Sequence, residues 1–235
     1  MPAVAPAMEA VRYSAAAATT AATARKTESG MSIVVRDVRE HELDSVLALN
    51  NAAGPAILPL DANRLRRFFR TAEYFRVAER DGSLAGFLAG FGPDADHDSG
   101  NYAWFRERYP RFLYIDRIVV ASRRRGGGLG RAFYADVQSH AELRYPHLAC
   151  EVFLEEGNDP ALLFHGSFGF REIGQRVMPA QDGNGPGVRA AMLVKELCSY
   201  PWVRETYGDR LPDAPWISQP RAGGDAFPAT GTSGH

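Results

Sequence analysis

The chain has 235 residues, of which 45% are hydrophobic and 23% charged, and its formal net charge is -1. This composition predicts one ordinary folded core with additional terminal segments. A nearly neutral chain has no overall field to attract nucleic acid or an anionic membrane, and no apolar run in it is long enough to span a bilayer.

The cysteines and histidines indicate no metal chemistry. Cys150 and Cys198 form no CxxC pair, and the six histidines form no cluster at ligand spacing. We therefore expect neither a disulfide framework nor a metal site, which is typical of a cytoplasmic protein.

The first 30 residues are rich in Ala and Thr and lack the apolar segment of a secretory signal. An organelle transit peptide is an alternative, but Glu9 and Glu28 count against it. We expect residues 1–30 to be a disordered extension, or Met31 to be the natural start of the chain.

Three elements are predicted before the first tight turn. Alternating residues predict a strand over 32–38, and apolar residues at helical spacing predict helices over 40–52 and 63–73. The second helix is basic because of four arginines: Arg64, Arg66, Arg67 and Arg70. Such a face is more often solvated than a binding site.

Asp81-Gly82 is the strongest short turn signal and predicts a hairpin between strands over 75–79 and 84–91. The following segment, 97–109, is expected either to cover an apolar amine or to form a homodimer contact. Its aromatic residues are Tyr102, Trp104, Phe105 and Tyr109.

The most informative segment is 123–131, with the sequence Arg-Arg-Arg-Gly-Gly-Gly-Leu-Gly-Arg, between a strand over 112–120 and a helix. Glycines permit positive φ and close approach of a ligand. The first turn of the helix adds N–H groups without internal partners and a dipole that favours anions. The loop therefore predicts a diphosphate site.

Three kinds of phosphate loop compete for this segment. A nucleoside-triphosphate loop would end in Gly-Lys-Ser or Gly-Lys-Thr, where this chain has Gly130-Arg131-Ala132. A dinucleotide loop would need a glycine at Arg131 and an early position in the chain. What remains is Arg125-x-x-Gly128-x-Gly130, for which a solvated basic turn is the alternative without a binding role.

The helix after the loop has one apolar face, formed by Leu129, Phe133, Val137 and Ala141. A strand over 147–154 follows this helix. Because a single crossover helix joins them, the strands over 112–120 and 147–154 are expected to be parallel neighbours.

Asp159, followed by a proline, predicts the start of a short helix with Asp159 as its N-cap, and Gly169 predicts its end. Strands over 170–177 and 188–196 complete the sheet. Proline and glycine recur afterwards, so residues 199–235 are expected to form an extended arm that docks by its aromatic residues.

Two motifs in this order resemble the GNAT superfamily of N-acetyltransferases. The loop Arg125-x-x-Gly128-x-Gly130 is similar to the family's acetyl-coenzyme A loop. The strand, Asn158, short helix and Gly-Phe exit that follow look like its second motif. The resemblance covers about residues 32–197.

Further details look closest to an uncharacterised bacterial branch of predicted acetyltransferases. They are the segments 49–53, 101–105 and 114–120. The chain departs from that branch at Phe153 and at 155–157, which puts a shared acceptor in doubt.

The resemblance implies a mixed α/β sheet of about seven strands flanked by about four helices, within a domain over residues 31–198. In the family, the strands that correspond to 112–120 and 147–154 splay apart and admit the pantetheine arm. It also implies transfer of an acetyl group from acetyl-CoA, without a metal, to a primary amine of a small molecule or an exposed protein amine.

For the co-substrate, the resemblance implies that the backbone of Ile118, Val119 and Val120 holds the thioester. The diphosphate would be bound by the loop residues Arg125, Gly126, Gly127, Gly128, Leu129, Gly130 and Arg131. Asn158 matches an asparagine that contacts the pantetheine arm, and an ordinary turn asparagine is the alternative.

His165 occupies the position of the tyrosine that protonates the departing thiolate in many family members. An imidazolium with a pKa of about 6.5 is a competent donor to a thiol with a pKa of about 8.5. The alternative is a partly buried histidine bonded to a carbonyl.

Asp116 is the preferred general base, because alternation places it on one face with Ile118 and Val120 unless a bulge intervenes. The alternative is an ion pair with Arg117 or another arginine. Glu151 is the second choice, since an acid on the next strand could reach across the splay.

The acceptor pocket is expected to be lined by 50–60, 97–109 and 178–187, but its amine cannot be named from the sequence. We expect no nucleic acid or membrane partner. Because the usual tyrosine is absent, a non-catalytic acyl-CoA sensor or interaction domain is the alternative function.

Overall fold

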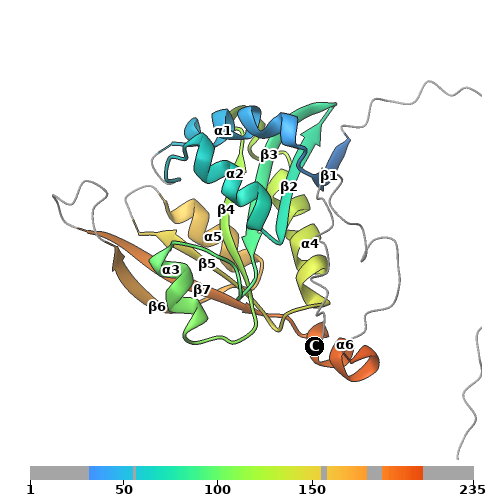
Figure 1. The fold of residues 1–235 in the computed structure, drawn as a ribbon, viewed down its shortest axis with the longest axis vertical. Helices are drawn as coiled ribbons and strands as arrows, with labels where there is room; N and C mark the ends of the chain where they lie inside the picture. The colour runs from blue at the N-terminus through green and yellow to red at the C-terminus, as the bar shows by residue number, and fades with distance from the viewer. Residues whose placement is uncertain (1–31, 55–56, 155–157, 179–186, 209–235) are drawn as a thin grey trace, which may run out of the picture. The chain divides into compact units, whose positions relative to one another are not determined.

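The computed structural model describes residues 32–54, 57–154, 158–178 and 187–208, so the expectations for 1–30 and for 209–235 lie outside the described residues. The strands form one seven-stranded sheet in the order β1-β2-β3-β4-β5-β7-β6 (Figure 1). They are β1 (Ile33–Asp37), β2 (Tyr74–Arg80), β3 (Ser83–Phe91), β4 (Leu113–Val120), β5 (His147–Phe153), β6 (Arg171–Met178) and β7 (Val188–Glu196).

Six α-helices and two short 3-10 helices accompany this sheet within the described residues. The α-helices are α1 (Leu43–Asn51), α2 (Ala62–Thr71), α3 (Gly100–Arg106), α4 (Leu129–Glu142), α5 (Asp159–Ser167) and α6 (Ser199–Tyr207), and the 3-10 helices are η1 (Glu40–Glu42) and η2 (Ser122–Arg124). The expected α/β fold is confirmed, and α3 and α6 are additions to the four expected helices. None of the described helices combines the length and the apolar character needed to cross a membrane.

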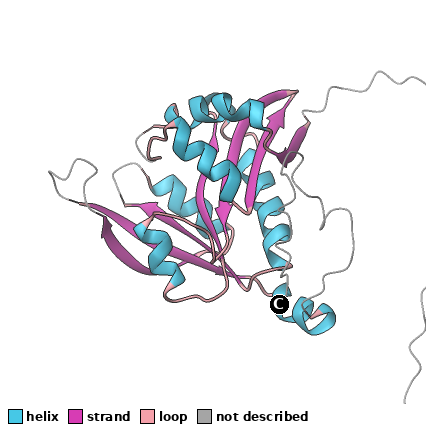
Figure 2. Ribbon diagram, in the orientation of Figure 1, coloured by secondary structure: helices cyan, strands magenta, loops and turns pink. Residues whose placement is uncertain are grey.

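The sheet separates two buried apolar clusters. Residues of α1, α2 and α3 pack on one face, and residues of α4 and α5 pack on the other. Figure 1 shows α1 and α2 together on one side with α4 on the opposite side, and Figure 2 shows helices flanking the strands in the same view. The sheet is therefore covered by helices on both faces.

The turn between β2 and β3 is the expected two-residue hairpin. Asp81 and Gly82 have φ values of 55° and 72°, and Arg80 pairs directly with Ser83. Positive φ at both central residues matches the right-handed twist of the paired strands, which is why Asp-Gly is favoured there. This prediction is confirmed.

Strands β4 and β5 separate soon after they meet. They pair in parallel only at Leu113 with Leu148 and at Tyr114 with Ala149. Beyond these two pairs the strands diverge, so the facing edges of both are left without a ladder partner. The expected splay is confirmed.

A β-bulge interrupts β4 at Asp116. Ala89 of β3 pairs with Arg117 and the next residue, Gly90, pairs with Ile115, so Asp116 is the extra residue. A bulge of this kind breaks the alternation of side chains along the strand.

The bulge corrects the expected face of β4. Ile118 and Val120 pack with the cluster that contains α4, whereas Asp116 contacts His97, whose ring lies 4.5 Å from that of Phe91 in the opposite cluster. The expectation that Asp116 shares a face with Ile118 and Val120 is therefore wrong.

The aromatic segment before β4 is mostly core. Tyr102 and Phe105 of α3 are fully buried, and the Tyr102 hydroxyl donates a hydrogen bond to the Gly92 carbonyl oxygen over 2.8 Å. Trp104 lies beneath the Arg108 guanidinium, 4.0 Å from it. These contacts give Tyr102 and Phe105 a structural role, so the expectation that they cover an amine or form a dimer contact is wrong for these two.

The start of the expected extended arm is instead helical. Helix α6 begins at Ser199 and ends at Tyr207, and its Val203 is buried. The expectation of an extended chain is wrong for this part. Gly169 does end α5 as expected, with a φ of +82° directly after the C-cap Phe168.

Two glycines of β3 provide a matched test of the packing beside the gap. A Cβ on Gly86 would lie 2.5 Å from the Val119 carbonyl oxygen, whereas one on Gly90 would have no neighbour nearer than 3.5 Å. We expect Gly86→Ala to lower the free energy of unfolding by about 1–3 kcal/mol and Gly90→Ala to change it by less than about 1 kcal/mol. Urea denaturation followed by tryptophan fluorescence measures both, and equal losses would contradict the close approach at Gly86.

Candidate active site

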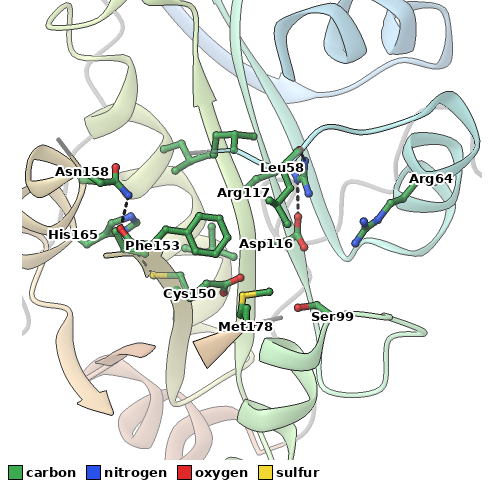
Figure 3. A pocket seen from close by; sticks show the side chains of 16 residues that line it. Leu58, Arg64, Ser99, Asp116, Arg117, Cys150, Phe153, Asn158, His165 and Met178 are labelled. Atoms are coloured by element: carbon green, nitrogen blue, oxygen red, sulfur yellow. Dashed lines mark hydrogen bonds and ion pairs between the residues drawn. The ribbon is translucent and has the colours of Figure 1, made fainter. Parts of the chain in front are cut away.

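The gap between β4 and β5 opens into a cavity of about 150 Å³ (Figure 3). Five residues singled out from the sequence line it: Asp116 and Ile118 on β4, Glu151 on β5, Asn158 before α5 and His165 within α5. Tertiary folding thus brings these five residues to one place.

The glycine loop forms the start of α4. Gly126 and Gly128 have φ values of +76° and +85°, and Gly128 is the N-cap of the helix. The first helical hydrogen bond runs from the Ala132 N–H to the Gly128 carbonyl over 2.9 Å, so the N–H groups of 129–131 have no acceptor within the helix. This geometry suits an anion.

Two arginines lie beside this loop. Exposed Arg125 makes only long contacts to carbonyl oxygens, 3.4 Å to Val120 and 3.3 Å to Ala53. Arg80 comes from the end of β2, and its guanidinium packs so closely on Gly127 that a Cβ there would lie 1.8 Å from Nη1. Arg80 carries no signal for this site in the sequence, because it is far from the loop along the chain.

The backbone at the end of β4 offers donors to the gap. The Ala121 N–H donates to the Ala85 carbonyl in β3 over 2.9 Å. Because successive N–H groups of a strand point to opposite edges, those of Ile118 and Val120 face the gap. Val119 pairs with Phe87 of β3 and its side chain is buried in the opposite cluster. Of the three residues expected to hold the thioester, the backbone donor of Val119 is therefore turned away.

Asp116 is a buried, doubly paired carboxylate. Its Oδ2 lies 2.6 Å from Arg117 Nε and its Oδ1 lies 3.0 Å from His97 Nε2. The Ser99 N–H donates to His97 Nδ1, so the imidazole proton is on Nε2, facing Asp116. Burial by itself would raise the pKa of Asp116, but Arg117 and His97 hold it well below its ordinary range. A carboxylate this weakly basic is a poor acceptor for a proton, and the geometry is that of the ion pair named as the alternative.

The partner of Asp116 fixes one wall of the cavity. The buried Arg117 donates from Nη1 to Asn50 Oδ1 over 2.7 Å and to the Leu58 carbonyl over 3.1 Å. Asn50 also donates to Leu58 over 3.2 Å. The bulge is thereby tied to α1 and to the segment that follows it, where Leu58 lines the cavity.

Glu151 has the opposite electrostatic environment. Burial and the nearby charge of Asp116 raise the pKa of Glu151 to about 7, although hydrogen bonds from Asn101 and Tyr114 lower it in part. The Tyr114 hydroxyl lies 2.8 Å from both carboxyl oxygens. A carboxyl that titrates near neutral pH can both accept and release a proton at low cost. The two neighbouring carboxyl groups thus have pKa values pushed apart, as in acid–base pairs of enzymes.

His165 is a buried imidazole, 6% exposed, that contacts a phenol. Its Nδ1 lies 2.5 Å from the Tyr134 hydroxyl oxygen on α4 and 3.7 Å from Cys150 Sγ. Burial lowers the pKa of His165 to about 4. At neutral pH the ring is therefore uncharged, and the expectation of an imidazolium donor is wrong under those conditions. The alternative of a bond to a carbonyl is not what the geometry shows either, because Nδ1 contacts Tyr134.

Asn158 joins the end of β5 to the start of α5. It occupies the N-cap position, one residue before the expected Asp159, but makes no capping bond with its side chain. Its Nδ2 instead donates to the Phe153 carbonyl over 2.7 Å. The N-cap expectation is wrong by one residue, and the amide lies at the cavity wall.

Sequence reasoning missed several residues that shape the site. Tyr114 could have been found, since it precedes Asp116 by two residues on the same strand. His97 and Asn101 carry no local signal, because each acquires its role only when the segment before β4 packs against the bulge. Among the described residues, no group of three or more His, Cys, Asp or Glu side chains is placed to hold a metal ion.

Comparison with known proteins identifies the family of this chain. A model described as the acetyltransferase (GNAT) family matches residues 40–170. The chain belongs to the GNAT family of acetyltransferases. None of the curated proteins compared matches it.

Solved GNAT structures share the fold. A ribosomal-protein-alanine N-acetyltransferase from Brucella melitensis is 27% identical, with a TM-score of 0.53 over 70% of this chain and 99% of that one. The ribosomal-protein-S18-alanine N-acetyltransferase from Escherichia coli is 16% identical, with a TM-score of 0.53 over 71% and 94%. Arabidopsis thaliana Naa50, solved with the bisubstrate analogue CoA-Ac-MVNAL, is 16% identical, with a TM-score of 0.54 over 70% and 99%. This chain therefore has the same overall fold as these solved acetyltransferases.

The raised pKa of Glu151 predicts a pH-dependent stability. Because its folded pKa of about 7 exceeds the ordinary 4.5, the native state binds this proton more tightly than the unfolded state. The resulting stabilisation is fully present below pH 4.5 and is lost as pH rises through 7. Relative to Glu151→Gln, the wild-type free energy of unfolding should fall by up to about 3 kcal/mol between about pH 5 and pH 8. Urea denaturation across this range measures the difference, and parallel curves would contradict the raised pKa.

Proposed function

We propose that this GNAT transfers the acetyl group of acetyl-CoA to a primary amine by direct attack within a ternary complex. The observation that carries the proposal is Glu151, a carboxyl with a pKa of about 7 that lines the cavity between β4 and β5 beside the permanently ionised Asp116. Membership of the family supports acetyl transfer in general. The raised pKa of Glu151 supports a role for this residue as the base that accepts a proton from the amine.

The donor would bind along the gap. The N–H groups at the start of α4, with Arg125 and Arg80, would hold the diphosphate. Asn158 would lie beside the pantetheine arm, and the N–H groups of Ile118 and Val120 would hold the thioester carbonyl. Each of these groups lies beside the gap between β4 and β5 or beside the glycine loop.

The proton balance assigns a role to Glu151. An alkylammonium must lose one proton to solvent before its nitrogen can attack the thioester carbonyl, and Glu151 would accept the second proton as the C–N bond forms. The tetrahedral intermediate then collapses as the C–S bond breaks, and coenzyme A leaves as a thiolate that takes up one proton from solvent, while Glu151 returns its proton to solvent. The N–H groups of Ile118 and Val120 would stabilise the negative oxygen of the intermediate.

His165 would act as a hydrogen-bond donor to the thiolate. When Tyr134 donates to Nδ1, the ring proton is on Nε2. A neutral imidazole holds this proton too strongly to give it up, so it stabilises the departing sulfur by a hydrogen bond. A thiolate with a pKa of about 8.5 is stable enough to leave in this way and gain its proton afterwards.

The two carboxyl groups predict different pH profiles. Glu151→Gln should lower kcat by about two to four powers of ten and remove the acidic limb of the kcat/KM profile near pH 7. Asp116→Asn should keep that limb but shift it to lower pH, because removal of a neighbouring negative charge lowers the pKa of Glu151. Thiol release with an amine that the wild type acetylates measures both profiles.

Loss of the limb in Asp116→Asn, with retention in Glu151→Gln, would reverse the assignment. Saturable acetyl-CoA binding without thiol release on any amine would instead favour the sensor alternative. Circular dichroism of each variant shows whether a loss of rate is a loss of fold.

Arg125 predicts a selective loss of donor affinity. Arg125→Ala should weaken binding of coenzyme A roughly ten-fold, because a charge-assisted contact to the diphosphate is lost. Pantetheine lacks the diphosphate and should bind both proteins equally. Calorimetric titration measures these affinities. Arg70→Ala, at an exposed position of α2, is the control variant. An equal loss of affinity for pantetheine in Arg125→Ala would contradict the diphosphate role.

A further inference from the structure

Arg64 brings a positive charge to the cavity from α2. Its side chain lines the same cavity as Asp116 and Glu151. Figure 3 shows the guanidinium extending from the helix toward the Asp116 side of the cavity. The group lies across the cavity from Asn158 and His165 (Figure 3).

The charge of Arg64 is only partly balanced by the part of the chain that the structure describes. Arg64 and Arg67 share a single carboxylate, that of Asp98, at 3.0 Å and 2.6 Å. The Nε of Arg64 is buried and has no hydrogen-bond partner among the described residues. This N–H is covered by protein, so the terminal N–H groups of the Arg64 side chain, which is 29% exposed, are the ones left for an oxygen supplied by a ligand.

The remaining charged groups around the cavity are already engaged. Arg117 and His97 pair with Asp116, and Tyr114 bonds Glu151. Three arginines, Arg64, Arg67 and Arg117, therefore face two carboxylates with lowered pKa values, Asp98 and Asp116. Because Arg64 and Arg67 share the one carboxylate of Asp98, the excess of positive charge among these groups lies on α2, whatever the protonation of Glu151.

We propose that the acceptor is an amine that also carries an anionic group, a carboxylate or a phosphate, which Arg64 binds while the amine lies near Glu151. This inference rests on the proposed function and names its substrate class. A guanidinium presents paired N–H donors that match the oxygens of either anion. Ile57, Leu58 and Met178 line the same cavity, so the rest of the acceptor is expected to be apolar.

Matched amines test the proposal with the full chain and acetyl-CoA. Phenylalanine is compared with phenethylamine, leucine with isoamylamine, and phosphoethanolamine with ethanolamine, so the arms distinguish carboxylate from phosphate. We expect kcat/KM for thiol release to be about 10- to 100-fold higher for the anionic member of at least one pair. Arg64→Gln should abolish that preference, and Arg64→Lys should retain part of it.

Arg70→Gln is the control, since Arg70 is an exposed arginine of the same helix, and it should keep the wild-type preference. An unchanged acetyl-CoA affinity in Arg64→Gln would show that the variant is folded. Equal acetylation of charged and uncharged amines by the wild type, or a preference that survives in Arg64→Gln, would overturn this inference alone. Absence of thiol release with all six amines would contradict the proposed function as well.

Discussion

The site depends on the early separation of β4 from β5. Two residue pairs hold the parallel strands together, and the ladder then stops, which leaves backbone donors of β4 directed into open space. Elsewhere in a sheet such groups are paired with a neighbouring strand, because an unpaired buried N–H is costly. Here the strands diverge between two helical layers, and a ligand can reach donors that the fold would otherwise use. The cavity and its lining follow from this single interruption.

The bulge at Asp116 sets the electrostatics of that cavity. By adding one residue to β4, it turns the carboxylate of Asp116 toward His97 and Arg117, which keep it ionised. The fixed negative charge then acts on Glu151, whose burial already disfavours ionisation. Asp116 is thus a structural anion that helps make its neighbour basic enough to accept a proton. A local irregularity in the backbone of β4 thus raises the pKa of a carboxyl group on the neighbouring strand β5.

The contact between α4 and α5 joins the glycine loop to His165. A Cβ on Gly130 would lie 2.9 Å from the Phe164 ring, so the absence of a side chain lets the two helices approach. This approach places Tyr134 of α4 against His165 of α5 and excludes water from the imidazole. The glycine-rich loop, which we propose binds the diphosphate, therefore also allows the packing that sets the protonation of His165.

The sequence by itself determined the order of the strands, the Asp81-Gly82 hairpin and the glycine loop, because alternation, turn chemistry and positive φ are local properties. It also singled out five of the residues that line the cavity: Asp116, Ile118, Glu151, Asn158 and His165. Only the tertiary structure decided their protonation, since the pKa of Glu151 depends on burial and on charges from another strand. The bulge in β4 arises from pairing with β3 and has no local signature, so the face of Asp116 could not be read from its spacing. Local backbone preferences depend on residues that are close in the sequence, whereas the desolvation and ion pairing of side chains arise only when distant segments pack together.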